Sequence, residues 1–158
     1  MFERFTREAR DVVKRSHEEA ARLRSPTVDA EHLLLALAAP GSGPPATVLA
    51  DAGLDREGLL AAFDAELRDT LEGIGLPAAA LLEQAPPSGS RSPRWGQSAK
   101  LALERSVKAA GARRDRRLLP AHILLGVLRA EAGAVPRALR TAGVEPPELA
   151  ARMAAAMG

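Results

Sequence analysis

The chain contains no cysteine and no tyrosine, and aromatic residues make up only 3% of it. The absence of cysteine excludes a disulfide scaffold and any thiolate metal site. With so few aromatic residues, the hydrophobic content of 46% predicts a core built from aliphatic side chains. No apolar run approaches the roughly 18 residues of a membrane span, and the charged N-terminus does not resemble a secretory signal. We therefore expect a cytoplasmic protein without a membrane partner.

Net charge is also nearly absent. The 22 basic and 20 acidic residues leave a formal charge of +2, although the pI is near 9.6. Lysine occurs only as Lys14, Lys100 and Lys108, so arginine carries most of the positive charge. A charge this small does not point to nucleic acid as a partner. The many alanines and arginines indicate a GC-rich genome, and 158 residues suit one domain or two small domains that share an interface.

Sequence motifs of catalysis are missing too. The chain has no GxxxxGK[ST] phosphate loop, no GxGxxG dinucleotide motif and no GxSxG nucleophile motif. The adjacent Glu18 and Glu19 are expected on an open helix face, where nothing would shift their pKa values toward acid–base catalysis. We therefore predict that the chain is not an enzyme and holds neither a cofactor nor a metal.

The strongest feature that is present is an internal repeat with an offset of 90 residues. The segment Asp29–Leu37 (DAEHLLLAL) returns as Leu119–Val127 (LPAHILLGV). The same offset holds without a gap from Phe5/Trp95 to Ala65/Ala155. Such a repeat predicts two copies of one supersecondary unit. The leucine-rich segment is apolar nearly all round, so we expect a buried helix at the centre of each copy, called here the signature helix.

Helical periodicity and the scarcity of β-branched residues predict an all-α fold of eight helices in two pseudo-symmetric four-helix bundles, without strands. The first copy is expected over residues 1–70 and the second over residues 95–158. A flexible connector at 71–94, with a helical turn at 78–83, would join them into one domain. In the first copy we expect helices at 5–23, from 29, at 46–52 and from 55. In the second we expect them at 97–110, from 119, before Gly143 and from 146.

Several helix ends carry residues that favour a start or a stop. Thr6, Asp29 and Asp55 are suited to cap helix N-termini. Pro120 occupies the first helical position of the second signature helix, and Gly53 follows the third helix as a natural terminator. The fourth helix is expected to bury one apolar face, made of Leu59, Leu60, Phe63 and Leu67.

Two groups of side chains could bind a ligand but also have a simpler interpretation. His32 and His122 are repeat equivalents, and a zinc site would need both of them to converge with a third ligand. The interpretation we favour is that each one hydrogen-bonds a neighbouring backbone group, while His17 is solvated. The basic run Arg113–Arg117 could contact phosphates, but Asp115 interrupts it and no aromatic residue is interleaved, which favours a solvated loop.

The opening residues Met1–Arg10 (MFERFTREAR), the doubled (Glu/Ala)-His-(Leu/Ile)-Leu-Leu motif and the Leu…Gly pair ending the third helix resemble the N-terminal domain of ClpA/ClpC-type unfoldases. The resemblance covers nearly the whole chain. In that family the domain is a double four-helix repeat, the Clp repeat, in front of AAA+ ATPase rings. It receives adaptors and substrates for degradation by the ClpP protease. Since no ATPase motif is present, the resemblance implies a free-standing copy of the receptor domain.

In ClpC-type domains each repeat can bind a phosphoarginine mark. The family uses a threonine at the start of the first helix and the glutamate before the signature histidine. The matching residues are Thr6 and Glu31 in the first repeat, but Gly96 and Ala121 in the second. A guanidinium needs a carboxylate partner, so the resemblance implies one such site at most. The alternative is that Thr6 only caps its helix and Glu31 only places a charge in a first turn.

A second family surface lies between the two first helices. In actinobacterial ClpC it accepts cyclic-peptide antibiotics through a phenylalanine near the N-terminus, basic residues and the aromatic residue that opens the second repeat. The matching positions here are Phe2, Arg10, Val13, Trp95, Lys100 and Glu104. Large aromatic residues and arginine dominate binding hot spots, which favours a peptide pocket. Alternatively, Trp95 simply packs its own repeat as Phe5 does.

The resulting hypothesis is a non-enzymatic module that binds peptides or degron-marked proteins and modulates Clp proteolysis. It would deliver substrates to a ClpC-type unfoldase, compete for them, or sequester peptide antibiotics. The alternative is a regulatory protein that docks on the unfoldase, on one of its adaptors or on a transcription factor. Nucleic-acid binding through Arg113–Arg117 and an enzymatic activity are both disfavoured.

Overall fold

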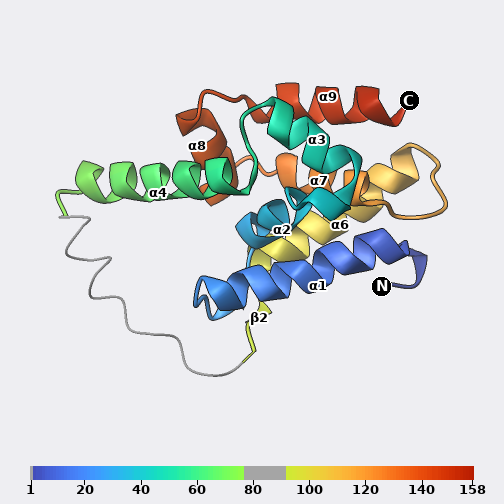
Figure 1. Ribbon diagram of the computed structural model, residues 1–158, viewed down its shortest axis with the longest axis horizontal. Coiled ribbons are helices and arrows are strands. Elements are labelled where there is room, and N and C mark those ends of the chain that lie inside the picture. Colours follow the sequence, from blue (N-terminus) through green and yellow to red (C-terminus); the bar gives the residue numbers. More distant parts are fainter. Residues whose placement is uncertain (1, 77–91) are drawn as a thin grey trace.

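The computed structural model describes residues 2–76 and 92–158 (Figure 1). Within these ranges the chain forms eight α-helices, which confirms the predicted all-α fold. The predicted helical turn at 78–83 and most of the predicted connector lie outside the described residues, so the domain boundaries at 70 and 95 stay predictions.

The eight helices follow the internal repeat closely. The first repeat contains α1 (Arg7–Arg22), α2 (Ala30–Leu37), α3 (Pro44–Asp51) and α4 (Arg56–Gly73), with short 3-10 helices at η1 (Phe2–Arg4) and η2 (Pro40–Ser42). The second repeat contains α6 (Gln97–Ala112), α7 (Pro120–Leu128), α8 (Ala134–Thr141) and α9 (Pro146–Met157). Adding 90 to the bounds of α1 gives those of α6, and adding 90 to the bounds of α3 gives those of α8.

Local chemistry explains where several helices begin and end. The Thr6 hydroxyl accepts a hydrogen bond from the Ala9 N–H at 3.1 Å, and the Asp55 carboxylate accepts one from the Gly58 N–H at 2.8 Å. Gly53, with φ of +75°, follows α3 in a left-handed conformation that favours glycine. These predicted helix ends are therefore confirmed.

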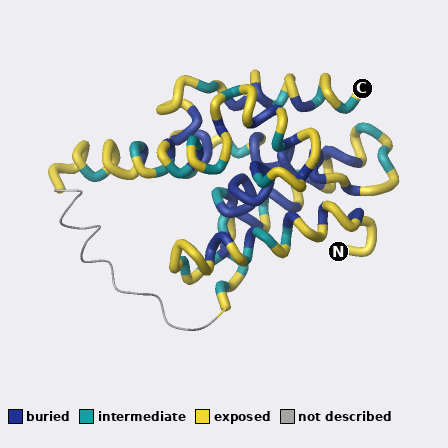
Figure 2. Tube along the Cα trace, in the orientation of Figure 1, coloured by how far each residue is buried: buried dark blue, intermediate teal, exposed yellow. Residues whose placement is uncertain are grey.

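The far end of α4 differs from the prediction. The helix continues to Gly73, and its C-terminal half extends beyond the rest of the described chain (Figures 1 and 2). Leu59 is buried and Leu60 and Phe63 are partly buried, but Leu67 is 39% exposed. The prediction that Leu67 is buried was wrong, because the buried face of α4 is made by Leu59, Ala62 and Glu66, and Leu67 lies beside that face.

The prediction of no strands was wrong at two short places. β1 (Thr27–Val28) pairs in parallel with β2 (Arg94–Trp95), so that Val28 lies opposite Trp95. Its repeat equivalent is an isolated bridge between Phe5 and Leu118. Each pairing joins the start of one repeat to the loop before the signature helix of the other. Pairings this short carry no alternating pattern that sequence periodicity could detect.

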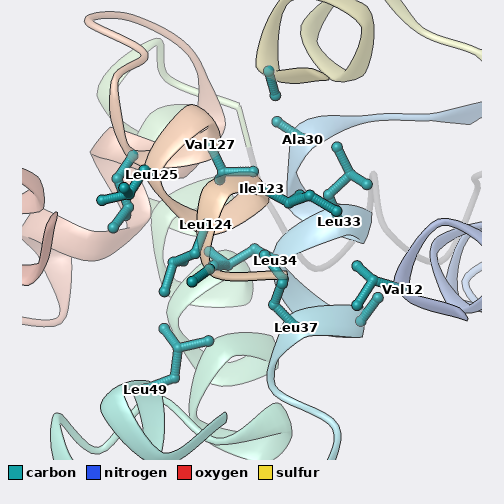
Figure 3. Packing of buried hydrophobic residues seen from close by; sticks show 14 of the residues in the cluster. Val12, Ala30, Leu33, Leu34, Leu37, Leu49, Ile123, Leu124, Leu125 and Val127 are labelled. Atoms are coloured by element: carbon teal, nitrogen blue, oxygen red, sulfur yellow. The ribbon is translucent and has the colours of Figure 1, made fainter. Parts of the chain in front are cut away.

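The two repeats share one core instead of forming two separate bundles. The signature helices α2 and α7 contact each other at the centre, where Ile123 and Leu124 point toward Leu33 and Leu34 (Figure 3). The outer helices cross between repeats as well, since α4 packs against α8 and α3 packs against α9. The predicted double four-helix repeat is present, and its two copies pack into a single interlocked body.

Two buried glutamates tie helices together. The Glu66 carboxylate, only 7% exposed, accepts hydrogen bonds from Arg137 Nε and Thr70 Oγ1, both at 2.7 Å, and so links α4 to α8. Glu19 is also 7% exposed, and Arg56 at the start of α4 pairs with it at 2.9 Å. The prediction that Glu19 lies on an open helix face was wrong, because the fold brings α4 over this side of α1.

Candidate functional site

The two signature histidines hold the starts of their helices. His32 Nδ1 accepts a hydrogen bond from the Asp29 N–H, and His122 Nδ1 accepts one from the Leu119 N–H, each at 2.8 Å. The backbone role that we favoured for both histidines is therefore confirmed. His122 Nε2, which must then carry the proton, donates to Asp115 Oδ2 at 2.7 Å. This hydrogen bond lowers the pKa of Asp115, whereas burial lowers the pKa of His32.

A cleft of about 650 Å³ opens at the start of α2, between the two repeats. We call it the Glu31 cleft. The first repeat contributes the α2 N-terminus, and the second contributes α6 and the segment between α7 and α8. It is lined by Asp29, Ala30, Glu31, Ser98, Leu101, Ala102, Arg105, Val127 and residues 129–136.

The charged groups of the Glu31 cleft have opposite signs. Glu31 is half-buried, and burial, followed by the charges of Asp29 and Glu66, raises its pKa. Among the described residues none forms an ion pair with Glu31. Arg105, Arg129 and a further acidic residue, Glu131, line the same cleft. The cleft therefore offers three carboxylates, those of Asp29, Glu31 and Glu131, and two guanidinium groups.

Asp29 and His32 lie close to Glu31, but their side-chain acceptor atoms are already engaged. One potential ligand atom of each of these three residues lies within 4.8 Å of the other two, a spacing that a cation could use. However, the Asp29 carboxylate accepts hydrogen bonds from Thr27 Oγ1 at 2.7 Å and Ser98 Oγ at 3.1 Å. His32 Nδ1 accepts the Asp29 N–H. The arrangement leaves Glu31 as the acceptor for a ligand, which suits a guanidinium better than a metal that needs several ligands.

Thr6 is not part of the Glu31 cleft. Its hydroxyl caps α1 and donates to the Leu118 carbonyl at 3.3 Å, so it lies beside the start of α7. That region borders a second cleft of about 430 Å³, lined by Glu8, residues 41–45, Arg113, Asp115, residues 119–121, Ala156 and Met157. The structure does not bring Thr6 and Glu31 together, and the predicted pairing of the two within the first repeat is corrected. The start of each first helix faces the signature helix of the other repeat.

The repeat equivalent of Thr6 is Gly96, which lies beside Asp29 at the start of α2. A Cβ atom at Gly96 would collide with the Asp29 carboxylate, which fills this space. The Gly96 N–H donates to the Val28 carbonyl at 2.8 Å, which holds the start of α6 against this loop. Gly96 thus lies beside the start of α2, which carries Glu31, and Thr6 lies beside the start of α7, which carries Ala121.

The six residues of the predicted cyclic-peptide surface lie in η1, α1, β2 and α6. Phe2, Arg10, Lys100 and Glu104 are exposed, whereas Val13 and Trp95 are half-buried. The Trp95 ring meets the half-buried His17 ring edge-on, with centroids 4.6 Å apart. The prediction that His17 is simply solvated was wrong, because the β1–β2 pairing places Trp95 against it.

Phe2 belongs to a different turn of this surface. Its ring meets Phe5 edge-on at 4.9 Å, and its carbonyl accepts a hydrogen bond from Arg10 Nη2 at 3.3 Å. The Phe2–Phe5 contact therefore lies just before α1, whereas the His17–Trp95 contact lies in the second half of α1. Within the described residues, no helix combines the length and the apolar character needed to cross a membrane.

An eight-helix double repeat with an interlocked core defines an all-α double-repeat domain, and comparison with known proteins identifies its family. The family model of the Clp repeat (R) N-terminal domain matches residues 4–142. The chain belongs to this family.

Relatives and solved structures agree with this assignment. The chain is 33% identical over 146 residues to chloroplastic chaperone protein ClpC1 of Oryza sativa subsp. japonica, covering 92% of this chain but 14% of ClpC1. It is 33% identical over 144 residues to chaperone protein ClpB of Oceanobacillus iheyensis, covering 91% of this chain and 16% of ClpB. The match is thus to a small part of these relatives.

Two solved N-terminal domains share the fold. The ClpD domain of Arabidopsis thaliana superposes with a TM-score of 0.69 at 21% identity, covering 99% of this chain and 96% of that domain. The Hsp104 domain of Candida albicans gives 0.68 at 18% identity, with coverages of 99% and 93%. At these identities the likeness concerns the fold alone.

Proposed function

We propose that this chain is a non-catalytic docking module that binds peptide segments of protein substrates or adaptors, and that the Glu31 cleft holds an arginine or phosphoarginine side chain. The observation that carries the proposal is the half-buried Glu31 carboxylate, without an ion-pair partner among the described residues, in the lining of a cleft large enough for a side chain. A carboxylate in this setting pairs strongly with a planar guanidinium.

The remaining walls of the cleft fit the rest of such a ligand. Leu101, Ala130 and Ala134 line the cleft, are only partly buried, and provide aliphatic surface for the methylene stem of arginine. Arg105 and Arg129 provide positive charge for a phosphoryl group attached to the guanidinium. Membership in the Clp repeat family supports a peptide or adaptor as the source of the side chain.

Isothermal titration calorimetry with phosphoarginine and with arginine amide tests the proposal. We expect the wild-type chain to bind phosphoarginine, and Glu31→Gln to weaken binding roughly 10- to 100-fold, because a charge-assisted hydrogen bond contributes about 1.5–3 kcal/mol. Glu18→Gln, which changes an exposed glutamate of α1, is the matched control and should bind as the wild type does. Wild-type chain that binds neither ligand would contradict the proposal.

A second candidate ligand is a cyclic peptide on the α1–α6 surface. The half-buried Trp95, together with the exposed cations Arg10 and Lys100, supports it. In the same titration with a cyclic peptide, the Trp95→Ala variant should no longer bind, whereas the Glu31→Gln variant should bind as the wild type does. Equal binding by wild type and Trp95→Ala would leave Trp95 with a packing role only.

The wider setting is part of the proposal as well. A module of this kind would modulate Clp proteolysis by presenting substrates to a ClpC-type unfoldase or by withholding them. Direct docking on the unfoldase or on a transcription factor is the alternative, and a stoichiometric protein partner without peptide affinity would favour it. The cytoplasmic location and the actinobacterial source stay predictions.

A further inference from the structure

The hairpin between α6 and α7 carries a group of arginines that the Glu31 cleft does not use. Arg114, Arg116 and Arg117 are exposed, and none of them forms an ion pair among the described residues. Asp115 lies in the same run but accepts from His122 and pairs with Arg113 at 3.4 Å. The Asp115 carboxylate therefore does not pair with Arg114, Arg116 or Arg117.

Arg4 joins this group from a distant part of the sequence. Its Nε donates to the Arg116 carbonyl at 3.2 Å and its Nη2 donates to the Asp115 carbonyl at 3.3 Å. The Leu118 N–H donates to the Arg4 carbonyl at 2.9 Å. These bonds hold η1 against the hairpin and so add Arg4 to its three exposed arginines, and none of the four forms an ion pair among the described residues.

The repeat symmetry does not account for this surface. The equivalent loop of the first repeat, residues 23–27, reads LRSPT and contains a single arginine, Arg24. Arg24 and Arg114 share the same backbone role, since both have positive φ values, 54° and 61°, just after their helices. The additional arginines at 116 and 117 are thus not required by the fold of the loop.

Between two of the cations lies a small apolar notch. It has a volume of about 50 Å³ and is lined by Arg4, Phe5, Val107, Ala110, Arg117 and Leu118. Val107 is 38% exposed, whereas Phe5 is only 1% exposed. The notch therefore offers aliphatic surface flanked by guanidinium groups, and its one aromatic ring is not available for stacking.

We propose that Arg4, Val107, Arg114, Arg116 and Arg117, together called the arginine surface, bind an acidic peptide segment that carries a small aliphatic side chain. The carboxylates would pair with the arginines, and the aliphatic side chain would enter the notch beside Val107. Nucleic acid fits less well, because single-stranded bases bind on exposed aromatic rings and the ring in the notch is buried. This surface selects the opposite charge from the Glu31 cleft.

Fluorescence anisotropy with a labelled peptide rich in Asp and Glu around one central valine tests the proposal. Arg116→Glu/Arg117→Glu should weaken binding at least about tenfold, since reversing two charges removes two ion pairs and adds repulsion. Arg24→Glu, at the equivalent of Arg114 in the first repeat, should not change it. Val107→Asp should weaken binding with all arginines intact, and circular dichroism confirms that each variant is folded.

Two comparison probes decide whether the notch is used. A peptide of equal charge with serine in place of valine, and an oligonucleotide of similar charge, should both bind more weakly than the valine peptide. Equal binding of all three probes, or no effect of the charge reversal, would overturn the proposal. Glu31→Gln should leave valine-peptide binding unchanged, so failure here is distinguishable from failure of the Glu31 cleft.

Discussion

At the level of single residues, Glu31 and its repeat equivalent Ala121 differ in their surroundings as well as in charge. Glu31 lies in a cleft shared with Arg105 and Arg129, while Ala121 lines a cleft with Leu119 and Pro120. Burial and the neighbouring carboxylates Asp29 and Glu66 raise the pKa of Glu31. A bound guanidinium would oppose these effects, because an opposite charge favours the ionised carboxylate.

This raised pKa predicts how arginine binding depends on pH. Because the guanidinium stays charged throughout, affinity for arginine amide should fall as pH decreases through the raised pKa of Glu31, beginning at a higher pH than an ordinary glutamate would give. Calorimetry over a pH series measures this. The affinity of Glu31→Gln for arginine amide should be weak and should not change over the same pH range. A wild-type affinity that depends on pH in the same way as that of the variant would contradict the prediction.

The same pKa shift has a consequence for stability in the absence of ligand. A carboxyl group whose pKa is raised on folding favours the folded state when protonated, and this advantage is lost as pH rises through the folded pKa. At neutral pH the ionised Glu31 therefore opposes folding. Glu31→Gln should be no less stable than wild type at neutral pH, so a loss of ligand binding in this variant would not reflect unfolding.

At the level of elements, the crossing of α6 and α7 depends on the absence of one side chain. A Cβ atom at Gly126 of α7 would lie 2.7 Å from the Ser106 N–H nitrogen and would also collide with Ser106 Oγ and the Ala102 carbonyl of α6. The equivalent position in α2 is Ala36, so the first repeat accommodates a methyl group where the second does not. The two helix pairs are therefore related but not interchangeable.

Gly126→Ala should lower the free energy of unfolding by about 1–3 kcal/mol, because overpacking against backbone atoms of α6 cannot be relieved by a side-chain rotation. Gly111→Ala is the matched control within α6, since a Cβ there meets nothing within 4 Å. It should raise stability by roughly 0.5–1 kcal/mol through helix propensity. Urea denaturation measures both, and a neutral Gly126→Ala would show that the crossing is less tight than described.

At the level of the whole molecule, the repeats are joined by contacts that cross between them. Parallel pairing of β1 with β2, packing of α4 on α8, and the ion pair of Glu66 with Arg137 all link one repeat to the other. Neither repeat closes its own hydrophobic core, since α2 and α7 pack together at the centre (Figure 3). This architecture favours one cooperative folding unit.

Cooperative folding can be measured with the single tryptophan. Trp95 lies at the junction, in β2 and against His17 of α1. Its fluorescence should report the same unfolding transition as far-UV circular dichroism. Arg137→Ala should shift both transitions equally, by about 1–2 kcal/mol, a value kept small because the Arg137 side chain is 56% exposed. Two separate transitions would indicate that the repeats unfold independently.

Much of the fold could be predicted because it depends on local patterns. The offset of 90 residues places equivalent helices, the spacing of leucines marks the buried signature helices, and Thr6, Asp55 and Gly53 mark helix ends by hydrogen bonds and backbone conformations within a few residues. The projecting end of α4 and the burial of Glu19 could not be predicted in this way. Both depend on which distant element covers a given helix face.

The candidate site shows the same division between sequence and tertiary structure. The sequence by itself determined that Glu31 has a carboxylate where Ala121 has none, because side-chain chemistry is a property of each residue. Only the tertiary structure decided that Gly96 lies beside the start of α2 and that Thr6 lies beside the start of α7. The offset of 90 residues does not reveal whether the first helix of a repeat starts beside the signature helix of its own repeat or of the other repeat. The partner is selected by the cross-repeat backbone pairs of Phe5 with Leu118 and Val28 with Trp95.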